Sequence, residues 1–200
     1  MENKAIKLFV RGLFRVLLKI VFRVKYIGEK SFPDEGPYII CSNHISMVDI
    51  PILACFAKGD RWIYFMAKKE FFSKPFTKWL FTKMSAFPVD RGNADIVSIR
   101  TATRYLKGGN LLGIFPQGTR SKADDALPGR KGPAMLASLT EAKIIPVLIE
   151  GQFKFRSKIK VYIGKPFDLG MKMKTKYSKQ VYQDKSQEIM KAIYALPEVY

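Results

Sequence analysis

The sequence contains little cysteine and almost no histidine. Its 200 residues include two cysteines, Cys41 and Cys55, and a single histidine, His44. Two cysteines without a CxxC pair argue against a disulfide-stapled secreted domain and against a structural zinc site. One histidine excludes a multi-histidine metal centre. We therefore expect no bound metal and no other cofactor, and any histidine chemistry must use His44.

Acidic residues are also scarce. Asp and Glu total 17 against 35 Lys and Arg, which gives a formal net charge of +18. Hydrophobic residues make up 48% of the chain, so it is not a disordered basic tail. The length suits one domain with a real core and an appended helix. The excess of cations indicates a negatively charged partner, which would be nucleic acid, anionic lipid or an acidic protein.

Long apolar runs are missing as well. No run reaches the roughly 18 residues that a transmembrane helix needs, and no signal-peptide cleavage site follows an unbroken apolar centre. A cation recurs at every fourth position near the N-terminus, at Lys7, Arg11, Arg15, Lys19 and Arg23. This pattern favours a basic amphipathic helix in the membrane interface, with cations toward anionic headgroups, over a helix packed on the protein's own core. We expect residues 1–25 to form this anchor and residues 26–200 to form one globular domain.

Beyond the N-terminal segment, short apolar runs alternate with helical patterns. The expected strands are Val24–Ile27, Tyr38–Ser42, Trp62–Ala67, Leu111–Phe115, Ile144–Ile149 and Lys158–Ile163. The expected helices span 5–24, 50–57, 74–84, 94–107, 132–142 and 178–195. Helices between apolar strands predict an α/β domain in which a mixed, largely parallel sheet is flanked by helices. The helix over 74–84 is also amphipathic and suits either a core or a membrane surface.

His44 lies in a segment, Asn43–Asp49, that links an expected strand to an expected helix. In a continuous helix, His44 and Asp49 would lie about 140° apart and would not meet. They can meet if His44 is in the loop and Asp49 begins the helix, which Pro51 supports because proline is tolerated in a first turn. Asp49 would then orient the imidazole and leave its other nitrogen as a proton acceptor. Alternatively, Asp49 is a helix cap or forms a capping box with Ser46.

Two further segments combine glycine with hydroxyl or arginine side chains. The residues concerned are Arg91 in Pro88–Gly92, and Gly118, Thr119 and Arg120 in Phe115–Ser121. We call these four residues the phosphate cradle. Glycine lets a backbone N–H approach a phosphate, threonine donates a hydrogen bond, and arginine supplies a planar charged fork. The pattern GxxxxGK[ST] is absent, so this is not a Walker loop.

In order and spacing, these segments resemble the blocks of the HxxxxD glycerolipid acyltransferases. Asn43–Asp49 fits the form NHxSxxD, in which Asn43 and Ser46 support the His and Asp positions. Pro88–Arg91, Phe115–Arg120 and Ile145–Val147 resemble the second, third and fourth blocks. One departure is Gln117, which stands where the family usually has Glu. Gln keeps the hydrogen bonding and loses the charge, so an obligatory carboxylate role does not survive at this position.

The resemblance implies a reaction. An acyl group would pass from a thioester, on acyl carrier protein or coenzyme A, to the sn-2 hydroxyl of lysophosphatidic acid, which gives phosphatidic acid. His44 would be the general base, Asp49 would orient it, and the phosphate cradle would hold the acceptor. The resemblance also implies a peripheral or monotopic protein on an anionic membrane surface, at the cytoplasmic face of the cell membrane. Another lysolipid or glycerol 3-phosphate stays open as the acceptor.

Two other classes of protein stay open. A row of cations at Lys154, Arg156, Lys158 and Lys160 alternates with Phe153, Phe155 and Ile159. This row suits a stacking platform for single-stranded nucleic acid, or an edge strand protected by cations. The first class is therefore a nucleic-acid-binding protein, and the second is a non-catalytic membrane-binding protein. The motif GxSxG is absent, which argues against a third class, the α/β-hydrolases. Because nucleic-acid binding does not require the amphipathic N-terminus, we expect no nucleic-acid partner.

Overall fold

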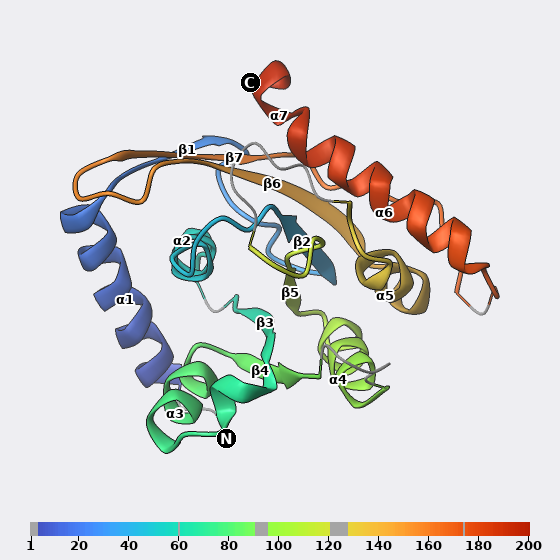
Figure 1. Ribbon diagram of the computed structural model, residues 1–200, viewed down its shortest axis with the longest axis horizontal. Coiled ribbons are helices and arrows are strands. Elements are labelled where there is room, and N and C mark those ends of the chain that lie inside the picture. Colours follow the sequence, from blue (N-terminus) through green and yellow to red (C-terminus); the bar gives the residue numbers. More distant parts are fainter. Residues whose placement is uncertain (1–3, 60, 91–95, 121–127, 174) are drawn as a thin grey trace.

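The computed structural model describes residues 4–59, 61–90, 96–120, 128–173 and 175–200. These residues form a seven-stranded sheet flanked by helices (Figure 1). The strands are β1 (Arg23–Gly28), β2 (Tyr38–Ser42), β3 (Ile63–Lys68), β4 (Ala86–Val89), β5 (Leu111–Ile114), β6 (Lys143–Gly151) and β7 (Lys158–Ile163). Their spatial order is β1-β7-β6-β2-β5-β3-β4, and every neighbouring pair is parallel except β6 and β7. The expected mixed, largely parallel sheet is confirmed.

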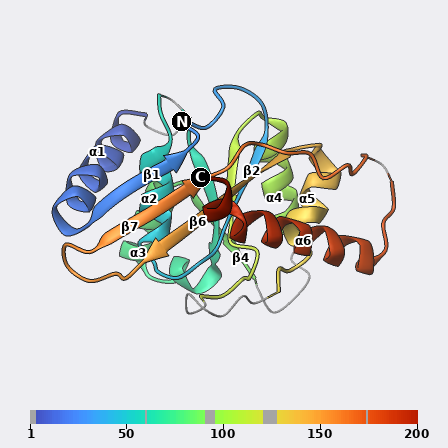
Figure 2. The same ribbon diagram turned by 90° about the horizontal axis from the view of Figure 1, so that it is seen from above.

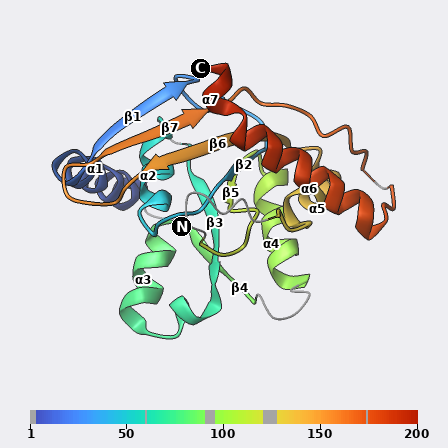
Figure 3. The same ribbon diagram turned by 45° about the horizontal axis from the view of Figure 1, so that its top comes forward.

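Helices cover both faces of the sheet. They are α1 (Lys4–Val21), α2 (Asp49–Phe56), η1 (Lys69–Phe72), α3 (Pro75–Lys83), α4 (Ile96–Lys107), α5 (Gly132–Thr140), α6 (Lys179–Tyr194) and α7 (Leu196–Val199). One apolar core contains side chains of α1, α2 and α3, and a second contains side chains of α4, α5 and α6. Figures 2 and 3 show α1 at one end of the molecule and α6 at the other. The sheet therefore lies between two apolar cores.

The sequence predicted six of the seven strands. The strand it missed, β4, contains Pro88 and pairs only with β3, at the edge of the sheet. Proline lacks the N–H that a central strand needs, so a sequence segment that contains proline is not predicted to be a strand. The short helices η1 and α7 were also missed, because a single turn carries too little periodicity to be predicted.

The orientation expected for the N-terminal basic row is wrong for two of its five cations, because Lys7 and Arg11 face the protein. The others, Arg15, Lys19 and Arg23, are exposed. Lys7 and Arg11 are only 4% and 5% exposed. The Lys7 ammonium lies 5.2 Å from the ring centroid of Trp62, and the Arg11 guanidinium lies 4.7 Å from the same ring. Cation–π contacts of this kind offset part of the cost of burying a charge.

Arg15 is exposed but also contacts the protein. Its guanidinium donates to the carbonyl oxygen of Cys55 at 3.1 and 2.9 Å and to that of Ala57 at 3.1 Å. These carbonyls lie at the C-terminal end of α2, where backbone oxygens lack helical partners and the helix dipole attracts a cation. The contact therefore fixes α1 to the end of α2 and stabilises that helix.

The outer face of α1 is apolar. Its exposed side chains include Phe9, Leu13, Val16, Leu17 and Ile20. Their spacing of three and four positions places them in one stripe along the helix. Among the described residues, no helix is both long and apolar enough to cross a membrane. The stripe is an apolar surface larger than scattered surface residues would make.

The row of cations near β7 does not form a stacking platform. Phe153 packs edge-on against Phe22, with ring centroids 5.7 Å apart, and Ile159 is fully buried. Nor is β7 an edge strand, because it lies between β1 and β6. Both interpretations of this segment are wrong. Only the cations and Phe155 remain at the surface.

A substitution at Gly113 would test how closely β3 and β5 pack. A Cβ at Gly113 would lie 2.3 Å from Cε1 of Phe65, which is its cross-strand neighbour. We expect Gly113→Ala to lower the free energy of unfolding by about 1–3 kcal/mol, the range for an overpacked core. Gly12→Ala is the control, because no atom lies within 4 Å of the added Cβ; on an exposed helix it should be stabilising by up to about 1 kcal/mol. Urea unfolding measures both, and equal effects would contradict the packing.

Candidate functional site

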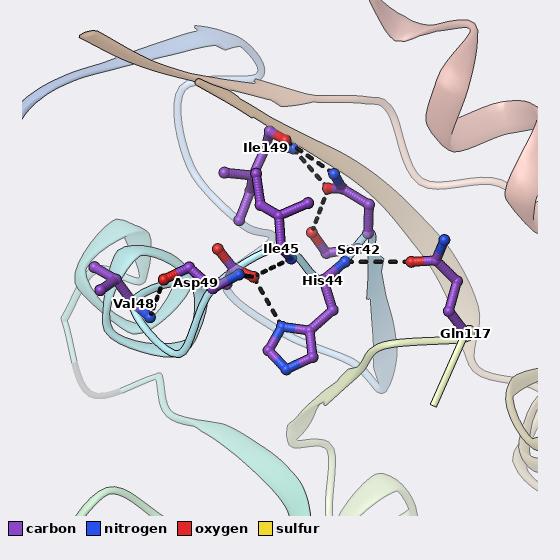
Figure 4. A network of polar contacts seen from close by, with 9 residues as sticks. Ser42, His44, Ile45, Val48, Asp49, Gln117 and Ile149 are labelled. Carbon is purple, nitrogen blue, oxygen red and sulfur yellow. Dashed lines mark hydrogen bonds and ion pairs between the residues drawn. The ribbon is translucent and has the colours of Figure 1, made fainter. Parts of the chain in front are cut away.

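His44 and Asp49 lie side by side at the carboxyl end of β2. His44 follows the strand in a loop, and Asp49 is the first residue of α2. The Nδ1 atom of His44 lies 2.8 Å from Oδ2 of Asp49 (Figure 4). A carboxylate can only accept, so Nδ1 carries the proton and Nε2 of the neutral ring carries a lone pair. No described residue bonds Nε2, and Figure 4 shows this atom pointing away from Asp49.

The same Asp49 oxygen holds the loop. The backbone N–H groups of Ile45 and Ser46 each donate to Oδ2 at 2.8 Å. Asp49 is fully buried, so these charge-assisted bonds and the N-terminal end of α2 stabilise a carboxylate that water does not reach. Asp49 is not the N-cap residue of α2, which is Val48, and its bond from the Ser46 N–H is one half of a capping box. The hydroxyl of Ser46 instead accepts from the N–H of Val48 at 3.2 Å, which closes the turn before α2.

Asn43 joins the loop to the neighbouring strand. Its Nδ2 donates to the carbonyl oxygen of Ile149 at 2.9 Å, and its Oδ1 accepts from the N–H of Ile149 at 2.8 Å. The side chain thus replaces a backbone pair and extends the ladder between β2 and β6 beyond the end of β2. This pairing fixes the point at which His44 leaves the sheet.

Gln117 approaches His44 from the end of β5. Its Oε1 accepts from the backbone N–H of His44 at 3.4 Å, and its Nε2 donates to the hydroxyl of Tyr194 at 3.3 Å. Gln117 is buried, and burial raises the pKa of Tyr194 while the hydrogen bond from Gln117 lowers it. The described contacts of Gln117 thus need hydrogen bonding and no charge.

Phe115 forms one wall of the site. Its ring stacks on the His44 imidazole with centroids 4.0 Å apart and planes 16° apart. A stacked ring restricts the imidazole to one orientation and excludes water from one face.

Neither cysteine is a nucleophile near neutral pH, because burial raises the pKa of the Cys55 thiol to about 11 and raises that of Cys41 further.

The phosphate cradle is only partly described. Arg91 lies outside the described residues. Gly118 has a φ of +71° in the turn after β5, and a Cβ there would lie 2.7 Å from Nε of Arg130. Thr119 and Arg120 follow in the same turn, and both side chains are exposed. Among the described residues, the structure brings Gly118 close to Arg130.

Sequence reasoning missed three residues of the site. Tyr194 comes from α6, and no sequence signal links it to Gln117. Arg130 lies ten or more positions after the third block, although the run Arg130-Lys131-Gly132 repeats the combination of arginine and glycine that marked the cradle. Phe115 ends an expected strand and begins the third block, but its contact with His44 depends on the parallel pairing of β2 and β5.

An apolar cavity adjoins the site. Its volume is about 510 Å³, and its lining includes Met66, Ile99, Phe115 and Met135, with Gly118 and Arg130 at a polar part. Because Phe115 also stacks on His44, the cavity and the imidazole share a wall. An apolar cavity beside a few polar groups is the usual form of a small-molecule site.

Within the described chain, no three His, Cys, Asp or Glu side chains cluster as metal ligands would.

Comparison with known proteins gives consistent matches. The family model described as Acyltransferase matches residues 23–150. A 1-acyl-sn-glycerol-3-phosphate acyltransferase of Bacillus subtilis is 32% identical over 164 residues, which cover 79% of this chain and 80% of that protein. A lyso-ornithine lipid O-acyltransferase of Pseudomonas aeruginosa is 31% identical over 136 residues, 66% of this chain and 48% of that protein.

A solved structure agrees in fold. The crystal structure of the 1-acyl-sn-glycerophosphate acyltransferase from Thermotoga maritima superposes with a TM-score of 0.68 and 25% identity, over 98% of this chain and 78% of that one. The matched family region includes the loop of His44 and Asp49 and the turn of Gln117 and Gly118. These findings confirm the resemblance seen in the blocks. This chain belongs to the acyltransferase family.

Proposed function

We propose that this protein transfers a fatty acyl group from a thioester to the sn-2 hydroxyl of 1-acyl-sn-glycerol 3-phosphate, giving phosphatidic acid. The observation that carries the proposal is the buried His44–Asp49 pair, 2.8 Å apart, beside an apolar cavity in a member of the acyltransferase family. The names of the relatives in Bacillus subtilis and Thermotoga maritima support this acceptor.

The proposed chemistry follows from the two nitrogens of His44. Nε2 removes the proton of the acceptor hydroxyl as its oxygen attacks the thioester carbonyl, and Asp49 stabilises the imidazolium that forms. The tetrahedral intermediate then expels the thiolate, which takes the proton from Nε2. The thioester is already activated, so no covalent acyl-enzyme is needed. The substrate's hydroxyl takes the place that serine has in a Ser-His-Asp triad.

The acceptor's phosphate needs cations near His44. Arg120, Thr119 and the Gly118 backbone lie in the turn after β5, and Arg130 contacts that turn. We assign them, together with Arg91, to the phosphate, because an arginine fork matches its oxygens. Fixing the phosphate would hold the hydroxyl beside Nε2 and convert the reaction into an effectively unimolecular step. The apolar cavity behind Phe115 suits an acyl chain.

We further propose a peripheral or monotopic membrane protein on the cytoplasmic face, with residues 1–25 as the anchor and residues 26–200 as the acyltransferase domain. The apolar stripe on α1 supports this, because its large side chains are exposed. Exposed Phe76 and Trp79 on α3 add a second apolar surface. The acceptor and the product are both amphipathic, so the protein would exchange them with the bilayer.

The acyl donor would be acyl carrier protein or acyl-CoA. Both are negatively charged, so the net charge of +18 would attract either one.

Another acceptor is a second candidate. The Pseudomonas aeruginosa relative is named for lyso-ornithine lipid, which belongs to a different class of lysolipid. The exposed Arg120 favours an acceptor that carries a phosphate, since an arginine fork is suited to that group.

The base assignment predicts a large loss of rate. His44→Ala should lower kcat for acyl transfer by about 10²–10⁴-fold, which is the usual contribution of a general base. Asp49→Asn should also lower kcat, because the amide cannot stabilise the imidazolium. Transfer from radiolabelled acyl-CoA to lysophosphatidic acid in detergent measures both, and cosedimentation with vesicles shows whether the variants are intact. Near-normal turnover by His44→Ala would overturn the assignment.

The contacts of Gln117 predict that its charge is dispensable. In Gln117→Glu, the carboxylate accepts from the His44 N–H, and the Tyr194 hydroxyl donates to it, so acyl transfer should continue. Gln117→Ala leaves buried groups without partners and should lower the free energy of unfolding by about 1–3 kcal/mol. Thermal unfolding and acyl transfer together separate these outcomes. Loss of transfer in Gln117→Glu, with normal stability, would show that the neutral amide is required.

The phosphate assignment predicts an effect on one substrate. Arg120→Ala should raise KM for lysophosphatidic acid by about 10–100-fold, the equivalent of a lost charged hydrogen bond, with little change in KM for the thioester. Arg104→Ala is the control, because Arg104 is an exposed arginine of α4 whose guanidinium packs over Tyr105. Equal effects of Arg120→Ala on both KM values would remove Arg120 from the phosphate site.

A further inference from the structure

We propose that a second cavity, at the C-terminal end of α1, binds the phosphate of an anionic phospholipid that is not a substrate. The cavity has a volume of about 500 Å³, and its lining includes the cations Arg15, Lys19, Arg23 and Arg156. It lies where α1, the start of β1 and the loop between β6 and β7 meet. The cavity beside His44 is lined by none of these residues. We call it the α1 cavity.

The charges of the α1 cavity are unbalanced. Its lining contains four cations and no Asp or Glu, and no ion pair in the described chain involves any of the four. Arg15 is held at the cavity by its bonds to the Cys55 and Ala57 carbonyls. Like charges that share a cavity repel one another, and an anion bound among them removes that repulsion. Phosphate fits, because arginine forks bind its oxygens in pairs.

The backbone of Arg156 supplies independent evidence. Its φ is +62°, in the left-handed region that glycine and asparagine adopt more readily than arginine. The loop requires this conformation, because the Arg156 N–H donates to the carbonyl of Val21 at 2.6 Å and the Arg23 N–H donates to that of Ser157 at 2.9 Å. Glycine would make the same backbone bonds without strain. An arginine held in a strained conformation points to a use for its side chain.

The surroundings of the α1 cavity indicate a lipid as the source of the phosphate. Leu17 and Ile20, on the exposed apolar stripe, flank the cavity residue Lys19 in sequence. Phe155, beside Arg156, is 75% exposed. The floor of the cavity is apolar and includes Leu18, Phe22 and Val24. Cations next to exposed apolar side chains match the boundary between headgroups and acyl chains, where basic residues recognise anionic lipid. Free phosphate would not need the apolar surface.

Such a site would determine the depth and orientation of the protein at the membrane surface. The lipid phosphate would fix the C-terminal end of α1 at headgroup depth, and Arg15 links that end to α2, whose first residue is Asp49. The site is therefore a docking site for bulk anionic lipid, and acyl transfer in detergent does not require it.

A matched pair of variants tests the site. Arg156→Asn and Lys154→Asn each remove one positive charge from the same loop, and Lys154 is exposed but does not line the α1 cavity. Asparagine tolerates the left-handed conformation, so Arg156→Asn should unfold at the same temperature as the wild type or a higher one. Binding is measured with the full chain on vesicles of phosphatidylcholine alone and of phosphatidylcholine mixed with phosphatidylglycerol.

We expect Arg156→Asn to reduce the preference for anionic vesicles by about fivefold, the contribution of one basic residue at a charged surface. Lys154→Asn should change it by clearly less. Equal losses in the two variants, or no loss in either, would overturn the site in favour of general surface charge. In the absence of lipid, a rise in the unfolding temperature with inorganic phosphate that Arg156→Asn abolishes would assign the cavity to free phosphate and overturn the lipid assignment. Acyl transfer in detergent is assayed separately, so failure of the proposed enzyme activity would not be mistaken for failure of this site.

Discussion

The geometry of the site depends on one buried carboxylate oxygen. Oδ2 of Asp49 accepts from the imidazole of His44 and from the N–H groups of Ile45 and Ser46. A single charge thus fixes the ring, the tautomer and the loop that carries the ring. The N-terminal end of α2 stabilises that charge, and Arg15 stabilises the opposite end of the same helix. Because Arg15 belongs to α1, the helix proposed to lie on the membrane is bonded directly to the helix that carries Asp49.

The high positive charge of the chain serves more than one purpose. Lys7 and Arg11 are buried against Trp62, and Arg15 caps α2, so these cations stabilise the fold. Lys7 and Arg11 are buried and cannot meet an anionic partner, whereas Arg15 also lines the α1 cavity. Composition alone gives the total charge, whereas burial decides which part of it faces a membrane, a phosphate or the protein's own core. Net charge is therefore a weak guide to the size of a binding surface.

Much of the fold and the centre of the site could be predicted from the sequence. Apolar runs located six strands, and the helix-breaking tendency of Pro51 placed His44 in the loop before α2. The orientation of α1 could not be predicted, because a row of arginines next to apolar residues suits headgroups and helix C-termini equally well. Tyr194 and Arg130 could not be predicted either, since both reach the site through tertiary packing. The amide of Asn43 pairs with Ile149, far along the chain, which no local pattern indicates.

The most direct test of the account is the identity of the lipid product. Purified protein in detergent would receive lysophosphatidic acid, lysophosphatidylcholine and lyso-ornithine lipid in equal amounts, with acyl-CoA and acyl carrier protein donors in separate reactions, and mass spectrometry would identify the acylated product. We expect phosphatidic acid as the main product, formed by wild type and not by His44→Ala. Selective acylation of either of the other two lipids, or equal yields of phosphatidic acid from both proteins, would contradict it.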